Sequence, residues 1–341
     1  MMTIFRRSSC SIMTLNASVI ALLATALLAG APATTTGKEQ PLRHDLVLPV
    51  SDWSAIPSRP LSIYTDEGII LVHRFPAVTD AQSHEMTPGV VVIPDPFAEA
   101  AEYIGVCIAL ARAGFSAFLI PWQAGPDGAP DPALSSRRAI AAINKLSYSA
   151  LADQRKLMIL GYCAGGSMAL TLVGTSLDIA AVVAYYPLIN LDAWQASQPA
   201  ANDLLTLISN NANWNLLLNP IATTANVKAP VLIHHGDADS WAPAAAAAEF
   251  IAAISQQNSA TAGRNAELNL IPSGQHFFDQ RDRQAAQTAW NKTISFFQNA
   301  PRLGRSRTDV VQIDPDNMPP LDAQLPQDMP PAGFAPMTDQ Q

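Results

Sequence analysis

Residues 157–167 read LMILGYCAGGS, and this stretch decides the fold. Its first four residues are an uninterrupted apolar run, which predicts a strand covered on both faces. A run rich in Ala and Leu, which predicts a helix, follows the glycines directly. A strand that passes into a helix through Gly-x-Cys-x-Gly-Gly is the pattern of a nucleophile elbow, with cysteine in place of serine. The turn is so sharp that side chains at Gly161 and Gly165 would collide with their surroundings.

We expect Cys163 to be the nucleophile of this elbow. It stands at the N-terminus of the predicted helix, whose dipole and free N–H groups favour a thiolate and a developing oxyanion. The N–H of Ala164 is the natural first donor to that oxyanion. Two other interpretations are a glycine-rich turn with a buried, inert cysteine and a loop that cradles phosphate. The second needs Gly-Lys-Ser/Thr, which is absent.

Segments of strand and helix character alternate around this stretch, which argues for a mainly parallel sheet flanked by helices on both faces. The expected strands are Leu61–Thr65, Ile69–Phe75, Val90–Pro94, Phe115–Ile120, Leu157–Leu160, Ala180–Tyr186, Val231–His234 and Leu268–Ile271. The expected helices are Ala98–Ala113, Pro132–Ser149, Cys163–Val173, Pro243–Gln257 and Arg283–Gln298. The first two strands, with only three residues between them, predict a hairpin at the sheet edge.

A nucleophile of this kind needs a base and an acid further along the chain, and both occur in the expected order. Residues 231–243 form a strand that ends in Gly-x-x-Asp, which makes Asp239 the expected orienting carboxylate. Asp237 is the rival, with turn formation as its simpler role. His276 lies in a loop just after the last strand and is the expected base, although a loop histidine before two aromatic residues can also pack against the core.

The remaining histidines predict no metal site, and we expect no cofactor. His234 and His235 are neighbours on a strand end and point to opposite faces, so they cannot chelate one metal ion together. The other three histidines are isolated, and surface or packing roles suffice for them: His44, His73 and His84.

At these positions the chain resembles the dienelactone hydrolase family of α/β-hydrolases over residues 61–300. The likeness rests on residues 161–166, 236–243 and 274–278, and on the block 90–118 with its Pro-Asp-Pro-Phe loop at 94–97. It implies the α/β-hydrolase fold and a Cys–His–Asp triad without a cofactor. Cys163 is then the nucleophile, His276 the base and acid, and Asp239 its partner.

The resemblance also implies a role for the loop at 94–97. A carboxylate at Asp95 would hold the resting thiol protonated, although the family usually has the longer Glu. Family members take a second oxyanion N–H from the next residue, which here is Pro96 and has none. Either Phe97 donates instead or the oxyanion hole is weaker. In the family, arginines hold the carboxylate of the substrate, and these arginines lack clear counterparts here. Arg281 lies near one of their positions but is not in register with it.

Four aromatic side chains are expected to line an apolar substrate pocket, although each is individually a reasonable core residue: Trp122, Trp241, Phe97 and Phe277. The expected reaction is hydrolysis of a small-molecule ester or lactone through an acyl-enzyme. The alternatives are a catalytically silent binding protein on the same fold and an acyltransferase. A thiol redox protein is disfavoured because Cys163 has no C-x-x-C partner.

Composition and the chain ends complete the prediction. The 341 residues carry a formal net charge of -8, which argues against nucleic acid as a partner. Residues 1–33 predict a signal peptide, with an uncleaved anchor as the alternative, so we expect an exported, periplasmic or secreted protein with no membrane contact after cleavage. Residues 34–60 predict a weakly structured lead-in, 61–300 the hydrolase domain, 187–230 a possible lid insertion, and 301–341 a proline-rich, disordered tail.

Overall fold

The computed structural model describes residues 58–304, apart from 66–67, 80–85, 127, 176, 191–213, 215–216 and 259–265. The predicted signal peptide, almost all of the lead-in, the tail beyond residue 304 and much of the predicted lid insertion lie outside the described residues.

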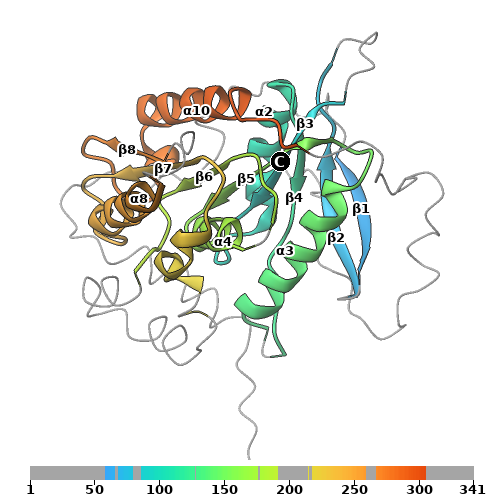
Figure 1. Cartoon of the computed structure of the whole chain (residues 1–341), viewed down its shortest axis with the longest axis horizontal. Coiled ribbons are helices and arrows are strands. Elements are labelled where there is room, and N and C mark those ends of the chain that lie inside the picture. The colour runs from blue at the N-terminus through green and yellow to red at the C-terminus, as the bar shows by residue number, and fades with distance from the viewer. Residues whose placement is uncertain are drawn as a thin grey trace, which may run out of the picture.

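Eight strands of the described chain form one sheet, in the order β1-β2-β4-β3-β5-β6-β7-β8 (Figure 1). Their bounds are β1 Arg59–Thr65, β2 Gly68–Phe75, β3 Pro88–Ile93, β4 Ser116–Leu119, β5 Asp153–Tyr162, β6 Val182–Tyr185, β7 Val231–Gly236 and β8 Ala266–Ile271. Strands β1, β2 and β4 pair antiparallel, and every pair from β4 to β8 is parallel. The expected strands and the edge hairpin are therefore confirmed.

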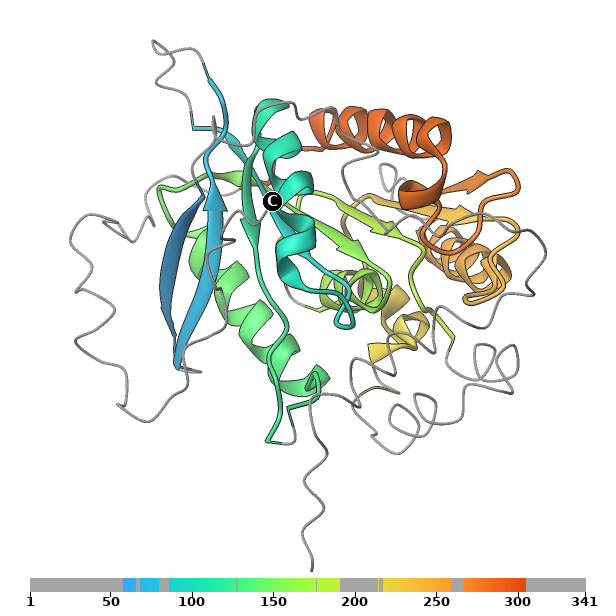
Figure 2. The same cartoon turned by 180° about the vertical axis from the view of Figure 1, so that it is seen from behind.

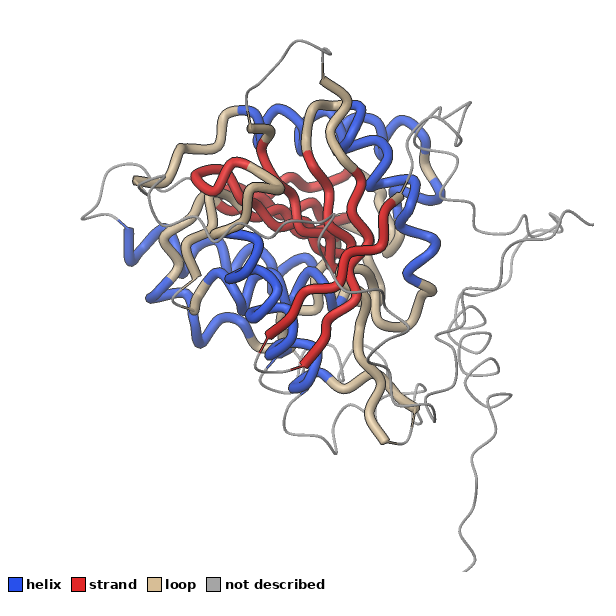
Figure 3. The backbone as a smooth tube through the Cα atoms, turned by 90° about the vertical axis from the view of Figure 1, so that its right-hand side faces the viewer, coloured by secondary structure: helices blue, strands red, loops and turns tan. Residues whose placement is uncertain are grey.

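Helices cover both faces of this sheet, as the views from the front, the back and the side agree (Figures 1, 2 and 3). Helices α2 and α10 lie on one face, and α3, α4 and α8 lie on the other. The bounds are α2 Ile104–Arg112, α3 Pro132–Ser147, α4 Ala164–Val173, α8 Ala244–Asn258, α9 Phe278–Arg281 and α10 Arg283–Gln298, with 3-10 helices at Ala100–Tyr103 and Pro220–Asn226.

Burial explains why the central strands are continuous apolar runs. Every residue of β6 and β7 is buried, because helices cover both faces there. The edge strand β8 instead exposes part of its length, and Leu270 is 49% exposed. The parallel arrangement brings the carboxyl ends of β3, β5, β6, β7 and β8 to one edge of the sheet.

The observed helices differ from those expected most clearly at three places. The helix predicted over Ala98–Ala113 begins with a 3-10 turn, in which Glu99 and Glu102 form a capping box, and becomes α-helical only at Ile104. Helix α4 begins at Ala164, because Cys163 has a non-helical backbone and caps the helix. The short helix α9, directly after the His276 loop, was not predicted from the sequence.

Candidate active site

Cys163 lies on a strained turn between β5 and α4. Its φ of 51° and ψ of -123° are unusual for a residue with a side chain. A Cβ at Gly161 would lie 2.7 Å from the Cα of Gly166, and a Cβ at Gly165 would lie 2.6 Å from the carbonyl oxygen of Ile93. These are closer than real Cβ contacts, so the two glycines permit the turn, as the sequence indicated.

Cys163 and His276 meet at the carboxyl edge of the sheet. The Nε2 atom of His276 lies 3.4 Å from the Sγ atom of Cys163, and both side chains are buried. On the other side of the ring, Nδ1 of His276 lies 2.8 Å from Oδ2 of Asp239. Because an ionised carboxylate only accepts, Nδ1 donates to it, and Nε2 is left to face the sulfur. The structure therefore brings the three residues into one chain of contacts.

The Asp239 carboxylate is fixed by its own turn. Its Oδ1 atom accepts the N–H groups of Trp241 at 2.8 Å and Ala242 at 2.9 Å, which leaves Oδ2 for His276. The rival Asp237 is exposed and points elsewhere, since its Oδ1 accepts the N–H of Ser273 at 2.6 Å. Asp239 is therefore the carboxylate that contacts the imidazole.

The loops that carry Asp239 and His276 are in backbone contact. Gly236 and Gly274 approach so closely that a Cβ on Gly236 would lie 3.0 Å from the Cα of Gly274, with the Gly274 carbonyl nearer still. The N–H of Ala238 donates to that carbonyl at 3.0 Å. Glycine at both positions thus holds the two loops together.

The electrostatic environment favours an ionised Asp239 and a neutral thiol. Burial raises the pKa of Asp239, but His276 and His235 outweigh it, so the pKa lies well below its usual range. Burial raises the pKa of Cys163, the charge of Asp95 raises it further, and the N–H of Ala164 opposes both. This environment favours the protonated thiol of Cys163 over the thiolate.

Asp95 is buried beside the sulfur and also engages the expected second oxyanion donor. Its carboxyl group forms a hydrogen bond with Cys163 that raises the pKa of the thiol. Its Oδ1 atom also accepts the N–H of Phe97 at 3.1 Å. In this arrangement the N–H of Phe97 is therefore occupied by Asp95, whereas that of Ala164 faces the sulfur.

The four expected pocket aromatics fall into two groups. Phe97 and Trp122 both stack on Trp214, and their ring centroids lie 6.0 Å and 5.5 Å, respectively, from that of Trp214. Trp214 belongs to the 187–230 insertion, is 1% exposed and covers both rings. Trp241 and Phe277 instead lie against the imidazole of His276, with centroids at 5.4 and 4.5 Å.

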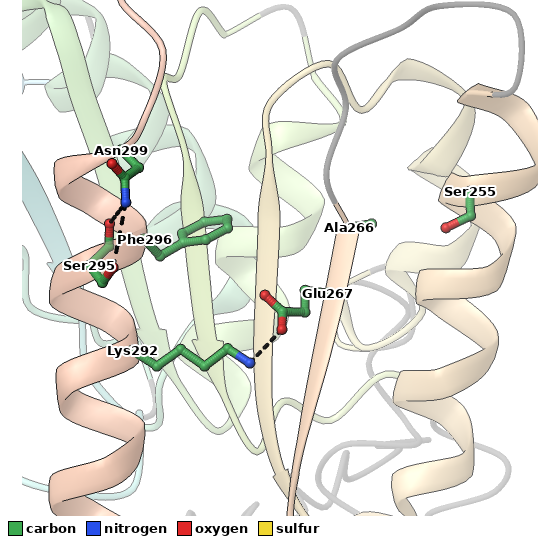
Figure 4. A pocket seen from close by; sticks show the side chains of 7 residues that line it. All are labelled: Ser255, Ala266, Glu267, Lys292, Ser295, Phe296 and Asn299. Carbon is green, nitrogen blue, oxygen red and sulfur yellow. Dashed lines mark hydrogen bonds and ion pairs between the residues drawn. The ribbon is translucent and has the colours of Figure 1, made fainter.

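The described part of the chain has a cavity beside this site and another away from it. One of about 160 Å³ opens beside Asp95 and is lined by Trp122, Gln123 and several prolines. The other, of about 570 Å³, lies between α10, β8 and α8 (Figure 4). An ion pair between Lys292 and Glu267 crosses it. Only the first adjoins the reacting groups.

Arg281 is exposed at the end of α9, while the neighbouring Gln280 is buried. Among the described residues, no group of three or more His, Cys, Asp or Glu side chains could hold a metal ion. No helix of the described chain is long and apolar enough to span a membrane. Cys107 and Cys163 are both buried and unpaired.

His235 is the site residue that sequence reasoning missed. Its Nε2 atom lies 3.3 Å from Oδ2 of Asp239, the same oxygen that contacts His276. His234, its neighbour on β7, instead contacts Thr293 and Asn269. The spacing of four residues between His235 and Asp239 was the available signal, but it is informative only once the turn geometry is known.

The model of the dienelactone hydrolase family matches residues 128–300, which is half of the chain and includes all three residues of the contact chain. The chain belongs to the dienelactone hydrolase family. It is a hydrolase that acts on ester or lactone bonds. A Bradyrhizobium protein named a probable 2-oxo-3-(5-oxofuran-2-ylidene)propanoate lactonase is 28% identical over 229 residues, covering 61% of this chain and 82% of that protein.

Solved structures show that the fold is that of the α/β-hydrolases. A dienelactone hydrolase assigned in Klebsiella pneumoniae subsp. pneumoniae MGH 78578 superimposes with a TM-score of 0.54 at 19% identity, covering 72% of this chain and all of that one. The esterase Est2 from Thermogutta terrifontis superimposes with a TM-score of 0.56 at 17% identity, covering 73% of this chain and 96% of that one. The Pyrococcus horikoshii acylaminoacyl peptidase gives 0.59 at 14% identity, covering 74% of this chain and 43% of its own. The expected fold class is confirmed.

Proposed function

We propose that this family member hydrolyses uncharged esters or lactones through an acyl-enzyme on Cys163. The observation that supports the proposal most strongly is the continuous chain of contacts from the sulfur through His276 to Asp239. The Nε2 atom of His276, at 3.4 Å from the buried sulfur of Cys163, is placed to take the thiol proton.

In the proposed reaction, Nε2 of His276 removes the Cys163 proton as the sulfur attacks the substrate carbonyl. The N–H of Ala164 at the start of α4 stabilises the resulting oxyanion. The tetrahedral intermediate collapses, the C–O bond to the alcohol breaks, and the imidazolium returns the proton to the leaving oxygen. His276 then activates a water molecule that releases the acid and regenerates the thiol.

Asp95 is proposed to control both the nucleophile and the second oxyanion donor. In the resting enzyme its carboxylate favours the protonated thiol and accepts the N–H of Phe97. A substrate carbonyl oxygen that displaces Asp95 would receive that N–H as a second donor. One such donor is typically worth about 3 kcal/mol of transition-state stabilisation.

The preference for uncharged substrates follows from the surroundings of the nucleophile. Asp95 and Asp239 both act on the sulfur, and Asp95 adjoins the cavity that Trp122 lines. Arg281 is exposed, and the buried position beside it carries Gln280. A negatively charged substrate would meet repulsion here, whereas an apolar acyl or alcohol group could pack on the rings of Phe97 and Trp122.

The test compares Cys163→Ala with Cys107→Ala, since Cys107 is the other buried, unpaired cysteine and lies on α2. Neutral and anionic p-nitrophenyl esters and lactones of matched size serve as substrates. Cys163→Ala should abolish hydrolysis, Cys107→Ala should retain it, and neutral substrates should be turned over faster. Wild-type rates in Cys163→Ala would remove the nucleophile assignment.

We further propose that residues 1–33 direct export, on the basis of the positive pair at Arg6 and Arg7, the uncharged run 17–29 and the small-x-small motif at 31–33. N-terminal sequencing of the protein from a periplasmic or secreted fraction should then begin at Thr34. Full-length protein in the membrane fraction would instead support an uncleaved anchor.

A further inference from the structure

A second buried histidine shares the carboxylate that contacts His276. His235 ends β7 with its ring 1% exposed. Its Nε2 atom lies 2.7 Å from the carbonyl oxygen of Ala242 and 3.3 Å from Oδ2 of Asp239. The proposed reaction assigns it no task, although it touches the same oxygen as His276.

The contacts fix the protonation of this ring. A carbonyl oxygen can only accept, so Nε2 of His235 carries a hydrogen and donates it to Ala242. The Nδ1 atom is buried and has no hydrogen-bond partner among the described residues. A proton on Nδ1 would leave a buried donor unsatisfied, which is costly. The contacts therefore favour the tautomer of His235 that carries its hydrogen on Nε2.

Three residues form a closed ring of contacts. His235 donates to the carbonyl of Ala242, the N–H of Ala242 donates to Oδ1 of Asp239 at 2.9 Å, and Oδ2 of Asp239 faces Nε2 of His235. Rotation of the carboxyl group would break both sides of this ring at once. The ring thus fixes the plane in which Oδ2 meets His276.

We propose that His235 is a positioning residue for the reaction, which holds the Asp239 carboxylate ionised and aimed at Nδ1 of His276. The inference rests on the proposed function, because it acts through the same carboxylate. His235 supplies an N–H that also bonds the carbonyl of Ala242, so it contacts the same carboxylate oxygen as His276 from a fixed position.

The inference predicts a change in pH dependence when the donor is lost. A carboxylate with one donor fewer keeps more of its negative charge and holds the His276 imidazolium more strongly. The acid limb of kcat/KM should then move to higher pH. The other titratable groups that face the pair of Asp239 and His276 are Cys163, on which Asp95 acts, and Tyr186, whose ring lies 4.7 Å from that of His276 and on which Asp279 acts.

The experiment compares His235→Gln with His235→Asn in the full chain. Both carry a neutral amide, but only the Gln amide reaches as far as Nε2 of histidine. We measure kcat/KM for a neutral p-nitrophenyl ester from pH 5.5 to 9, and the rate of Cys163 alkylation by iodoacetamide in a Cys107→Ala background. The control is His234→Gln, which alters the neighbouring buried histidine that contacts Thr293 and Asn269.

His235→Asn should lose roughly tenfold in kcat/KM and shift the acid limb upward by about half a pH unit, while His235→Gln restores most of both. The control variant should keep the wild-type acid limb of kcat/KM at every pH at which it is folded. Equal behaviour of the Gln and Asn variants, or a wild-type limb in both, would overturn the inference. An active Cys163→Ala protein would overturn the proposed function instead, so the two failures are distinguishable.

Discussion

The glycines of the elbow offer a sharp test of how the nucleophile is held. An alanine Cβ at Gly165 would lie 2.6 Å from the Ile93 carbonyl oxygen and closer to that of Pro94. At Gly166 the nearest atoms would be 3.3 Å away. Both positions lie in the first turn of α4, so both substitutions gain the same helix propensity of about 1 kcal/mol. The difference between them therefore isolates the clash.

The magnitude follows from the displacement required. An ordinary contact of about 3.4 Å to the Ile93 carbonyl oxygen requires the end of β3 to move away from the elbow by at least 0.8 Å, and the nearer Pro94 carbonyl oxygen requires a larger movement. Such overpacking costs about 3 kcal/mol. After the propensity gain, Gly165→Ala should be destabilised by about 2 kcal/mol, which lowers the Tm by roughly 4–8 °C for a domain of this size. Gly166→Ala should unfold near the wild-type temperature.

Thermal unfolding followed by circular dichroism gives the stability, and p-nitrophenyl ester hydrolysis gives the activity. The displaced backbone carries Asp95 and faces Cys163, so Gly165→Ala should also lose about a hundredfold in kcat/KM, as misplacements near 1 Å do. Gly166→Ala should keep most of its activity. If the two variants shared one Tm and one rate, the steric account of the elbow would be refuted.

Two other expectations concern titration. Asp95→Asn removes a charge that raises the pKa of the Cys163 thiol, so alkylation by iodoacetamide at neutral pH should accelerate several-fold; an unchanged rate would show that the carboxylate does not act on the sulfur. Burial lowers the pKa of His234 from 6.5 to about 3, so the native state resists a proton that the unfolded chain accepts. Stability is then complete well above pH 6.5 and falls as the pH drops toward 3, by about 2 kcal/mol between pH 6.5 and 4.5. In urea titrations His234→Gln should show a flatter dependence over that window, and an equally steep one would contradict the assignment.

The sequence predicted what depends on local steric needs and on strand order. Gly161 and Gly165 indicate the elbow because only glycine fits the backbone there. Parallel strands bring Asp239 and His276 to the same end of the sheet as Cys163. These arguments need no knowledge of side-chain packing. The fold and the contact chain were therefore accessible from residue types and spacing.

Features that depend on the path of a turn were not accessible. His235 meets Asp239 only because residues 239–242 fold back toward β7, and no periodicity indicates that path. The stacking of Trp241 on the ring of His276 was likewise not indicated by the sequence. Phe277 adopts a left-handed backbone with φ of 59°, which directs the chain into the unpredicted helix α9.

The backbone contact between Gly236 and Gly274 makes the acid and the base parts of one rigid piece, whereas the sulfur arrives on a separate strand and helix. We therefore expect thermal motion at this end of the sheet to lengthen the distance between His276 and the sulfur before the distance between His276 and Asp239. The histidine would remain oriented throughout such a motion, and each closure would return a correctly aimed base to the thiol.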